Sequence, residues 1–190
     1  MLILISGLLL FFAAHSVSIV NESWRNNVAG RIGEKAWMGL YSLISIAGFV
    51  LIVWGYGLAR LEPVVIYVPP DWLRHLAMLL LVFVFPLLVA TYFPGRISRA
   101  VKHPMLLATK VWAFSHLLMN GMLHDLFLFG AFLAWAVIDR ISMKRREQRP
   151  LPGAPASPIN DVIAVVAGLA LYMAFVFKLH GWLIGVPVIP

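Results

Sequence analysis

The chain has 190 residues, of which 62% are hydrophobic and only 12% are charged, whereas a soluble domain usually carries about twice that charged fraction. A membrane crossing takes roughly 20 helical residues, so the chain holds at most about six or seven spans and has no room for a soluble catalytic domain. The net charge of +7 reports on topology in a membrane protein rather than on nucleic acid, and the absence of cysteine excludes disulfides, iron–sulfur clusters and thiolate metal ligands.

Three membrane helices are predicted in the first half of the chain. Residues 1–20 are apolar and lack the positive n-region of a cleaved signal peptide, which predicts a retained first helix. A second span is predicted at 36–59, where serines and glycines allow close helix packing in lipid. A third is predicted at 71–93, with Asp71 as its N-cap and a kink at Pro86.

The segment 104–138 is too long for one crossing, because a single helix over it would extend about 52 Å. Asn120 and Gly121 lie near its midpoint and are typical turn residues, which predicts a hairpin of two helices. The last span is predicted at 159–177, with Gly181 as the following helix stop.

The basic residues decide between five and six spans. With the hairpin, the predicted loops 21–35, 94–103 and 140–158 face one side of the membrane, whereas a single long helix would place the third loop opposite the other two. The positive-inside rule therefore favours six spans, with these loops cytoplasmic and both termini outside. The predicted fold is an all-α, polytopic membrane bundle, one domain over 1–190, with a proline-rich extended linker at 149–158. The three loops hold eleven of the 15 basic residues, namely Arg25, Arg31, Lys35, Arg96, Arg99, Lys102, Arg140, Lys144, Arg145, Arg146 and Arg149.

Histidines are the main candidates for chemistry, because ionisable groups at membrane depth are costly and tend to mark functional sites. His15 and His116 both lie within predicted spans, either as ligands of one metal or as hydrogen-bond donors to neighbouring helices. Trp112, His116 and Asn120 follow each other at four-residue spacing, and such a helical stripe suits a flat aromatic cofactor. Lys110 either extends to the basic side of the membrane or pairs with a buried carboxylate, for example one on the cofactor.

Two further histidines lie near predicted turns. His103 precedes Pro104 at the membrane entrance, where a proton donor, a lipid headgroup contact and a helix cap are all compatible with it. His124 and Asp125 follow the hairpin turn, where Asp125 either orients His124 or forms a solvated loop pair with it. No other acidic residue is expected near membrane depth, so hydrolysis by a carboxylate pair is poorly supported.

Several short motifs together resemble the NnrU family of bacterial membrane proteins, which is linked to denitrification and includes the haem-dependent 15-cis-zeta-carotene isomerases. The resemblance covers roughly residues 1–180. The residues that carry it are Ala14-His15-Ser16, Gly33-Glu34, Tyr41-Ser42 and Lys102-His103-Pro104-Met105, followed by Trp112 and His116.

This resemblance implies a haem b whose iron is held by His15 and His116, with His103 in an acid/base or ligand-exchange role. The isomerases have a cysteine three residues before the second ligand, where this chain has Ala113, so ligand switching through a thiolate is excluded. The expected function is an isomerase-like or redox and nitric-oxide-linked protein of the bacterial inner membrane. Its expected partners are the lipid bilayer and a hydrophobic polyene or a small gaseous ligand, with no nucleic acid.

Two alternatives stay open. The Lys102-His103-Pro104 segment is also similar to the Arg-His-Pro-x-Tyr segment of membrane methyltransferases that use S-adenosylmethionine, although Leu106 stands at the tyrosine position. A cofactor-free membrane scaffold, binding a partner complex through the basic loops, is the other alternative.

Overall fold

The structure, a computed structural model of the chain, describes residues 1–147, 149 and 151–189. Over these residues its regular elements are all helices, without a β-strand. Within the same residues four helices are long and apolar enough to cross a membrane, at Leu2–Val20, Glu34–Ala59, Trp72–Tyr92 and Ile159–Ile184. The all-α class is confirmed, and the four helices support a membrane protein.

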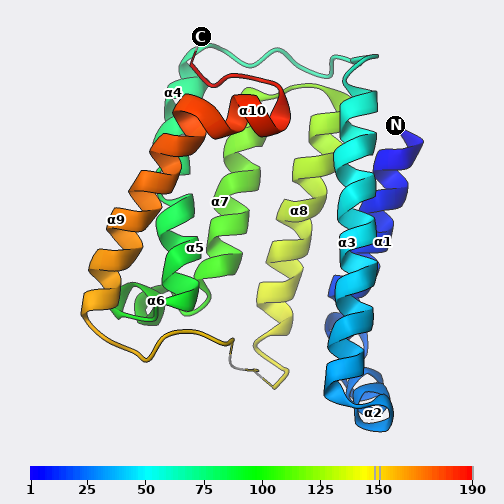
Figure 1. Cartoon of the computed structure of the whole chain (residues 1–190). Helices are drawn as coiled ribbons and strands as arrows, with labels where there is room; N and C mark the ends of the chain where they lie inside the picture. Colours follow the sequence, from blue (N-terminus) through cyan, green and yellow to red (C-terminus); the bar gives the residue numbers. More distant parts are fainter. Residues whose placement is uncertain (148, 150, 190) are drawn as a thin grey trace. The chain divides into compact units, whose positions relative to one another are not determined.

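The helices form two compact units (Figure 1). A single domain over 1–190 stays a prediction. The first unit contains α1 (Leu2–Val20), α2 (Glu22–Ile32), α3 (Glu34–Ala59) and α8 (Leu123–Ser142). The second contains α4 (Trp72–Leu81), α5 (Val84–Tyr92), α6 (Arg96–Val101), α7 (Pro104–Met119), α9 (Ile159–Ala174), the π-helical segment η1 (Phe175–Leu179) and α10 (His180–Ile184).

In the first unit, glycines bring α1 and α3 into main-chain contact. A Cβ added at Gly7 would lie 2.6 Å from the backbone nitrogen of Ile52, and one added at Gly48 would lie 2.7 Å from that of Phe11. Gly7 of α1 meets Ile52 of α3, and further along α1 Phe11 meets the earlier residue Gly48 of α3, so the two helices are antiparallel. The small residues of the predicted second span thus allow the close packing that lipid-embedded helices favour.

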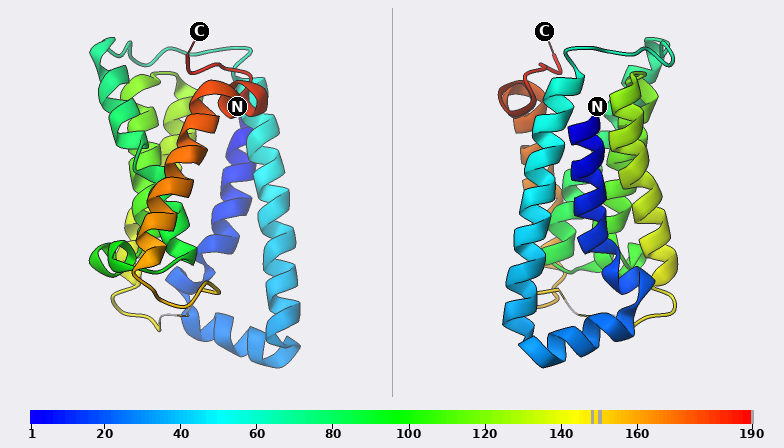
Figure 2. Two further views of the ribbon diagram at one scale, coloured as in Figure 1. Left: turned by 60° about the vertical axis from the view of Figure 1, so that its left-hand side comes forward. Right: turned by 90° about the vertical axis from the view of Figure 1, so that its right-hand side faces the viewer.

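The right panel of Figure 2 shows α1 between α3 and α8. The Phe132 ring of α8 lies 5.5 Å from Phe11 and 4.9 Å from Phe12, measured between ring centroids. Further along both helices, the Trp135 ring lies 5.7 Å from His15. Residues later in α1 therefore meet residues later in α8, which means that α8 runs parallel to α1 and forms an aromatic layer against it.

The predicted turn at Asn120 and Gly121 is present, since α7 ends at Met119 and α8 begins at Leu123. The Gly121 carbonyl accepts hydrogen bonds from the backbone N–H groups of Ile66, at 2.9 Å, and Tyr67, at 3.2 Å. A Cβ at Gly121 would overlap the Tyr67 carbonyl, so this close approach requires glycine. The segment 104–138 is therefore two helices, and their arrangement as a membrane-crossing hairpin stays a prediction.

In the second unit, the predicted third span is interrupted at residues 82–83, between α4 and α5. Pro86 has no N–H to donate to the carbonyl four residues earlier, which explains the interruption. Gly168 of α9 contacts the main chain of Pro86, so α9 packs closely on α5. Asp71 stands at the N-cap of α4, but its side chain makes no capping hydrogen bond.

Three expectations for the connecting segments were wrong. Helices α2 and α6 lie in basic segments that were predicted as loops. The Asn21 side chain caps α2 by accepting a hydrogen bond from the Trp24 N–H at 2.9 Å. The Asp161 carboxylate caps α6 by accepting hydrogen bonds from the backbone N–H groups of Arg96 and Ile97. The last helix does not stop at Gly181 but continues to Gly185, whose left-handed φ of 76° ends it.

The proline-rich linker is extended, as predicted, in the residues that the structure describes, and Pro150 lies outside them. It is also bound to the second unit, because the Ala154 N–H donates to the Tyr92 carbonyl at 2.8 Å and the Ser157 N–H donates to the Pro94 carbonyl at 3.1 Å. The segment 151–157 is therefore held within the second unit rather than being a loose tether.

Candidate functional site

His15 lies in an aromatic environment near the C-terminal end of α1. Its ring stacks on Phe11 at 3.9 Å and lies 5.1 Å from Tyr41 and 5.7 Å from Trp135, measured between centroids. The His15 Nδ1 is 2.8 Å from the Phe11 carbonyl oxygen. Because a carbonyl oxygen can only accept, Nδ1 carries the proton and Nε2 carries the lone pair. The ring is thus oriented and in the tautomer that binds a metal through Nε2.

Two buried polar features lie on α8, at Trp135, whose ring lies 5.7 Å from the His15 ring, and one turn further on at Asp139. Asp139 accepts a 2.6 Å hydrogen bond from Arg146 within an ion pair whose side chains are 8% and 15% exposed. The indole Nε1–H of Trp135 is buried and has no hydrogen-bond acceptor within the described residues. Neither feature was predicted from the sequence, although the spacing of His124, Trp135 and Asp139 along α8 places all three on one helical face.

His116 lies on α7 in the second unit. Its Nδ1 is 2.8 Å from the Trp112 carbonyl oxygen, which fixes the same tautomer as in His15. The Trp112 ring lies 5.3 Å from the His116 ring, as the predicted stripe requires, and it also packs against the core of Val84, Leu87 and Ala108. Since His15 and His116 belong to different units, a shared metal site stays a prediction.

The other predicted cofactor-binding residues have different surroundings. Lys110 is half-buried on α7 and forms no ion pair with a carboxylate in the described part of the chain. The Asn120 carbonyl accepts a 2.8 Å hydrogen bond from the Tyr67 hydroxyl. Asn120 thus helps to hold the turn before α8, and a role of Asn120, Lys110 or Trp112 toward a cofactor stays a prediction. No three His, Asp or Glu side chains gather as a metal site among the described residues.

His103 follows a strained turn at the start of α7. Lys102 has φ 64° and ψ −42°, and the His103 N–H donates to the Val101 carbonyl at 2.7 Å. These angles and this hydrogen bond resemble the rare γ-turn with positive φ, which is costly for a residue with a side chain. Such strain is often found at functional sites, and the acid/base or ligand-exchange role of His103 stays a prediction.

Replacing Lys102 with glycine is expected to stabilise the protein by about 0.5–1 kcal/mol, because glycine adopts a positive φ without steric cost. The measurement is thermal unfolding of the detergent-solubilised protein. Arg99→Gly, in the neighbouring helix α6, is the matched control and should destabilise by up to about 1 kcal/mol. Destabilisation by Lys102→Gly would show that the turn stores no strain.

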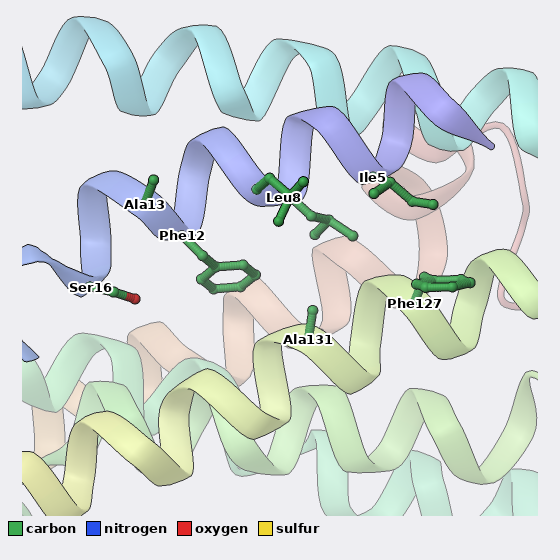
Figure 3. Close-up of a pocket in the computed structure, with 8 residues that line it drawn as sticks. Ile5, Leu8, Phe12, Ala13, Ser16, Phe127 and Ala131 are labelled. Carbon is green, nitrogen blue, oxygen red and sulfur yellow. The ribbon is translucent and has the colours of Figure 1, made fainter. Parts of the chain in front are cut away.

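An apolar groove runs along α1 and α8 in the first unit (Figure 3). It has a volume of about 500 Å³, within the range of small-molecule sites. A second groove, of about 370 Å³, shares Phe127 and Ala131 with it and extends to Leu123 and Leu126. The residues that line the larger groove are Ile5, Leu8, Leu9, Phe12, Ala13, Ser16, Phe127 and Ala131.

The interpretation of His124 and Asp125 as a solvated loop pair was wrong. Both lie in the first turn of α8 and are only 4% exposed. The Tyr56 hydroxyl of α3 donates a 2.6 Å hydrogen bond to Asp125. This partner lies 69 residues away in the sequence, so no local pattern predicted the burial.

The comparisons with known proteins identify a family. A family model described as NnrU protein matches residues 3–188, nearly the whole chain. No protein of curated function and no solved structure matches the chain. The motifs around His15 and His116 lie inside the matched region, and the chain belongs to the NnrU family.

Proposed function

We propose that this NnrU protein is a six-span protein of the bacterial inner membrane that binds haem b through His15 and His116. The observation that carries the proposal is shared by the two histidines. Each has its Nδ1 2.8 Å from the main-chain carbonyl four residues earlier, so Nε2 is the metal-binding nitrogen in both. Metal-bound histidines typically donate their other ring N–H to a carbonyl or carboxylate, which fixes the ring.

The surroundings of His15 fit a haem. Phe11 and Trp135 provide apolar, aromatic surface beside the ring that carries the ligand nitrogen. The unpaired Nε1–H of Trp135 requires an acceptor, because a buried donor without a partner costs about 1–3 kcal/mol. A carboxylate on the edge of the haem would be a suitable acceptor. When bound, haem would supply a redox-active iron whose potential depends on its axial ligands and on nearby hydrogen bonds.

This chain's own residues define what the site can do. Neutral His15 and His116 would hold the iron, and His103, positioned by the Lys102 turn, would exchange a proton as a catalytic residue. Ala113 is fully buried one turn before His116, so no thiolate competes for the iron there. We propose an isomerase-like or redox and nitric-oxide-linked role on this basis.

The topology part of the proposal adds α7 and α8 to the four helices that are long and apolar enough to span. Helix α8 has 20 residues and α7 has 16, and roughly 20 residues cross a bilayer core. With six spans the basic segments that contain α2 and α6 and the segment after α8 lie together on the cytoplasmic side, as the positive-inside rule favours.

The absorption spectrum of protein purified in detergent after expression with added haem tests the haem. We expect a Soret band that weakens in His15→Ala and in His116→Ala and disappears in the double variant. His180→Ala is the matched control, because the His180 Nδ1 is also bonded to a carbonyl, that of Val186, at 2.6 Å. A missing Soret band, or one unchanged by the double variant, would refute the proposal.

A further inference from the structure

Helix α2 lies at the membrane face where α1 ends and α3 begins. Both α1 and α3 are long and apolar enough to cross a membrane, and they run antiparallel, so the end of one and the start of the other emerge on the same side. Helix α2 fills the connection between them, from Glu22 to Ile32, and runs across their ends rather than along them (Figure 2). It is therefore placed at the membrane surface without crossing the membrane.

The start of α3 extends beyond the end of α1. In the antiparallel register, Phe11 of α1 meets Gly48 of α3. Since both helices rise equally per residue, Val20 at the end of α1 is level with about residue 39 of α3. Helix α1 is about 28 Å long, which matches a hydrocarbon core of about 30 Å. The first turn of α3, which contains Trp37, thus lies at the depth of the lipid headgroups.

Two contacts fix which side of α2 is turned toward the rest of the first unit. Ala29 is buried. The Arg25 guanidinium lies 2.5 Å from the Glu34 carboxylate and over the Trp37 ring, 5.6 Å from its centroid, and the Arg25 side chain is only 12% exposed. Gly33, with φ 88° and ψ 143°, makes the bend that brings Glu34 back to Arg25, and glycine adopts a positive φ without steric cost. The Gly33-Glu34 pair thus sets how α2 turns into α3.

This arrangement leaves an apolar stripe exposed on α2. Trp24, Val28 and Ile32 follow each other at four-residue spacing and share one side of the helix; we call them the α2 stripe. Trp24 is 51% exposed and Ile32 is 48% exposed. The Trp24 ring lies 6.1 Å from the Trp37 ring, edge to face, so the stripe begins at headgroup depth. An apolar stripe that carries tryptophan is typical of helices lying in the membrane interface. The residues on the other side of α2 are polar or small and exposed, namely Ser23, Asn26, Asn27 and Gly30.

Two exposed cations lie at the end of the α2 stripe. Arg31 is in the last turn of α2 and Lys35 is in the first turn of α3. In the described part of the chain, neither forms an ion pair with a carboxylate. Glu34, the acidic residue between them, is paired with Arg25 instead. The two cations therefore remain available for an anion, and a guanidinium beside an ammonium suits phosphate oxygens.

We propose that α2 is an interfacial helix that binds an anionic phospholipid of the surrounding bilayer. The α2 stripe inserts between acyl chains just below the headgroups, while Arg31 and Lys35 hold the lipid phosphate. Cations this close to a membrane surface attract anionic headgroups, whereas a zwitterionic lipid carries its own ammonium, which offsets that attraction. A soluble acidic protein fits the stripe less well, because Trp24 lies beside Trp37 at a depth where lipid covers it. The inference goes beyond the haem proposal and does not depend on it.

Native mass spectrometry of the detergent-solubilised protein, titrated with phosphatidylglycerol or phosphatidylcholine, tests the phosphate site. We expect the first phosphatidylglycerol to bind at least about tenfold more tightly than the first phosphatidylcholine, because each of the two cations contributes a few-fold. Arg31→Gln/Lys35→Gln should abolish this preference. Lys144→Gln/Arg145→Gln is the matched control, since it removes the same charge from another exposed basic pair of the first unit, and it should leave the preference unchanged.

Several outcomes would overturn the lipid site. They are equal affinity of the wild-type protein for the two lipids, and an equal loss in both double variants, which would show attraction by net charge alone. Excess inorganic phosphate should not displace the lipid, because it has no acyl chains; displacement would contradict a lipid site. Arg31→Lys/Lys35→Arg should retain the preference, which separates lost binding from lost folding. The Arg31→Gln/Lys35→Gln variant should keep the expected Soret band, so the two proposals fail separately.

The absence of cysteine allows a second test, of the side of α2 that faces the lipid. Ile32→Cys and Gly30→Cys place a polarity-sensitive fluorophore on opposite sides of the helix, and an added Cβ at Gly30 meets no atom within 4 Å. In nanodiscs that contain phosphatidylglycerol, nitroxide-labelled lipid should quench the label at Ile32→Cys at least about twofold more than the label at Gly30→Cys, and aqueous iodide should show the reverse order. Equal quenching at the two positions, or stronger iodide quenching at Ile32→Cys, would refute the interfacial position of the stripe.

Discussion

Replacing Gly48 with alanine is expected to lower the free energy of unfolding of the detergent-solubilised protein by about 2–3 kcal/mol. The new Cβ would lie 2.7 Å from the backbone nitrogen of Phe11 and 2.9 Å from its Cα. Backbone cannot swing aside as a flexible side chain can, so α1 must move away from α3, and overpacking of this kind typically costs about 1–3 kcal/mol. The midpoint of thermal unfolding should fall by roughly 5–10 °C.

The same helix offers a matched control. Gly57 of α3 has no atom within 4 Å of an added Cβ, so Gly57→Ala should stabilise by up to about 1 kcal/mol through helix propensity alone. The expected changes in the free energy of unfolding have opposite signs for these two Gly→Ala substitutions, which separates the effect of helix packing from that of helix propensity. If Gly48→Ala were as stable as Gly57→Ala, the close α1–α3 contact would be wrong.

The Gly48 contact also connects packing to the proposed site. The Phe11 carbonyl accepts the His15 Nδ1 hydrogen bond, and the Phe11 ring stacks on the His15 ring. A shift of α1 at Phe11 would therefore move the proposed ligand, and Gly48→Ala should weaken the Soret band whereas Gly57→Ala should not. This expectation rests on the haem proposal, whereas the stability difference does not.

The helices were predictable where one signal dominated. Long apolar stretches predicted the four candidate spans, and Pro86 and Gly121 predicted the breaks near them. Helices α2 and α6 were not predictable from hydropathy, because they are short and polar. Their ends depend on capping, by Asn21 locally and by Asp161 from the start of α9, and only the first of these is close in sequence.

The candidate site was predictable only in part. His15 and His116 were predicted to lie at membrane depth, where ionisable groups are costly, and the structure adds the Nδ1 bonds that fix their tautomers. The burial of His124 and Asp125 depends on Tyr56, and that of Asp139 depends on Arg146 folding back from beyond the end of α8. Side-chain partners from another element or beyond a helix end leave no periodic signal, so the sequence alone did not predict them.

Arg146 provides the clearest test of such a partner. We expect Arg146→Met to destabilise the protein by about 3–5 kcal/mol, because it leaves the Asp139 carboxylate buried without its counter-ion. The neighbouring Arg145 is exposed, so Arg145→Met should change the free energy of unfolding by less than about 0.5 kcal/mol. Thermal or denaturant unfolding in detergent measures both.

The double variant Asp139→Leu/Arg146→Met separates the cost of an unpaired charge from the value of the pair. Replacing both partners of a buried ion pair with apolar residues is often neutral or stabilising, so the double variant should recover most of the stability that Arg146→Met loses. A double variant as unstable as Arg146→Met would mean that the ion pair itself holds the end of α8 in place. Because Asp139 lies one turn after Trp135, whose ring lies 5.7 Å from the His15 ring, a recovered fold with an altered Soret band would show that the carboxylate tunes the proposed ligand.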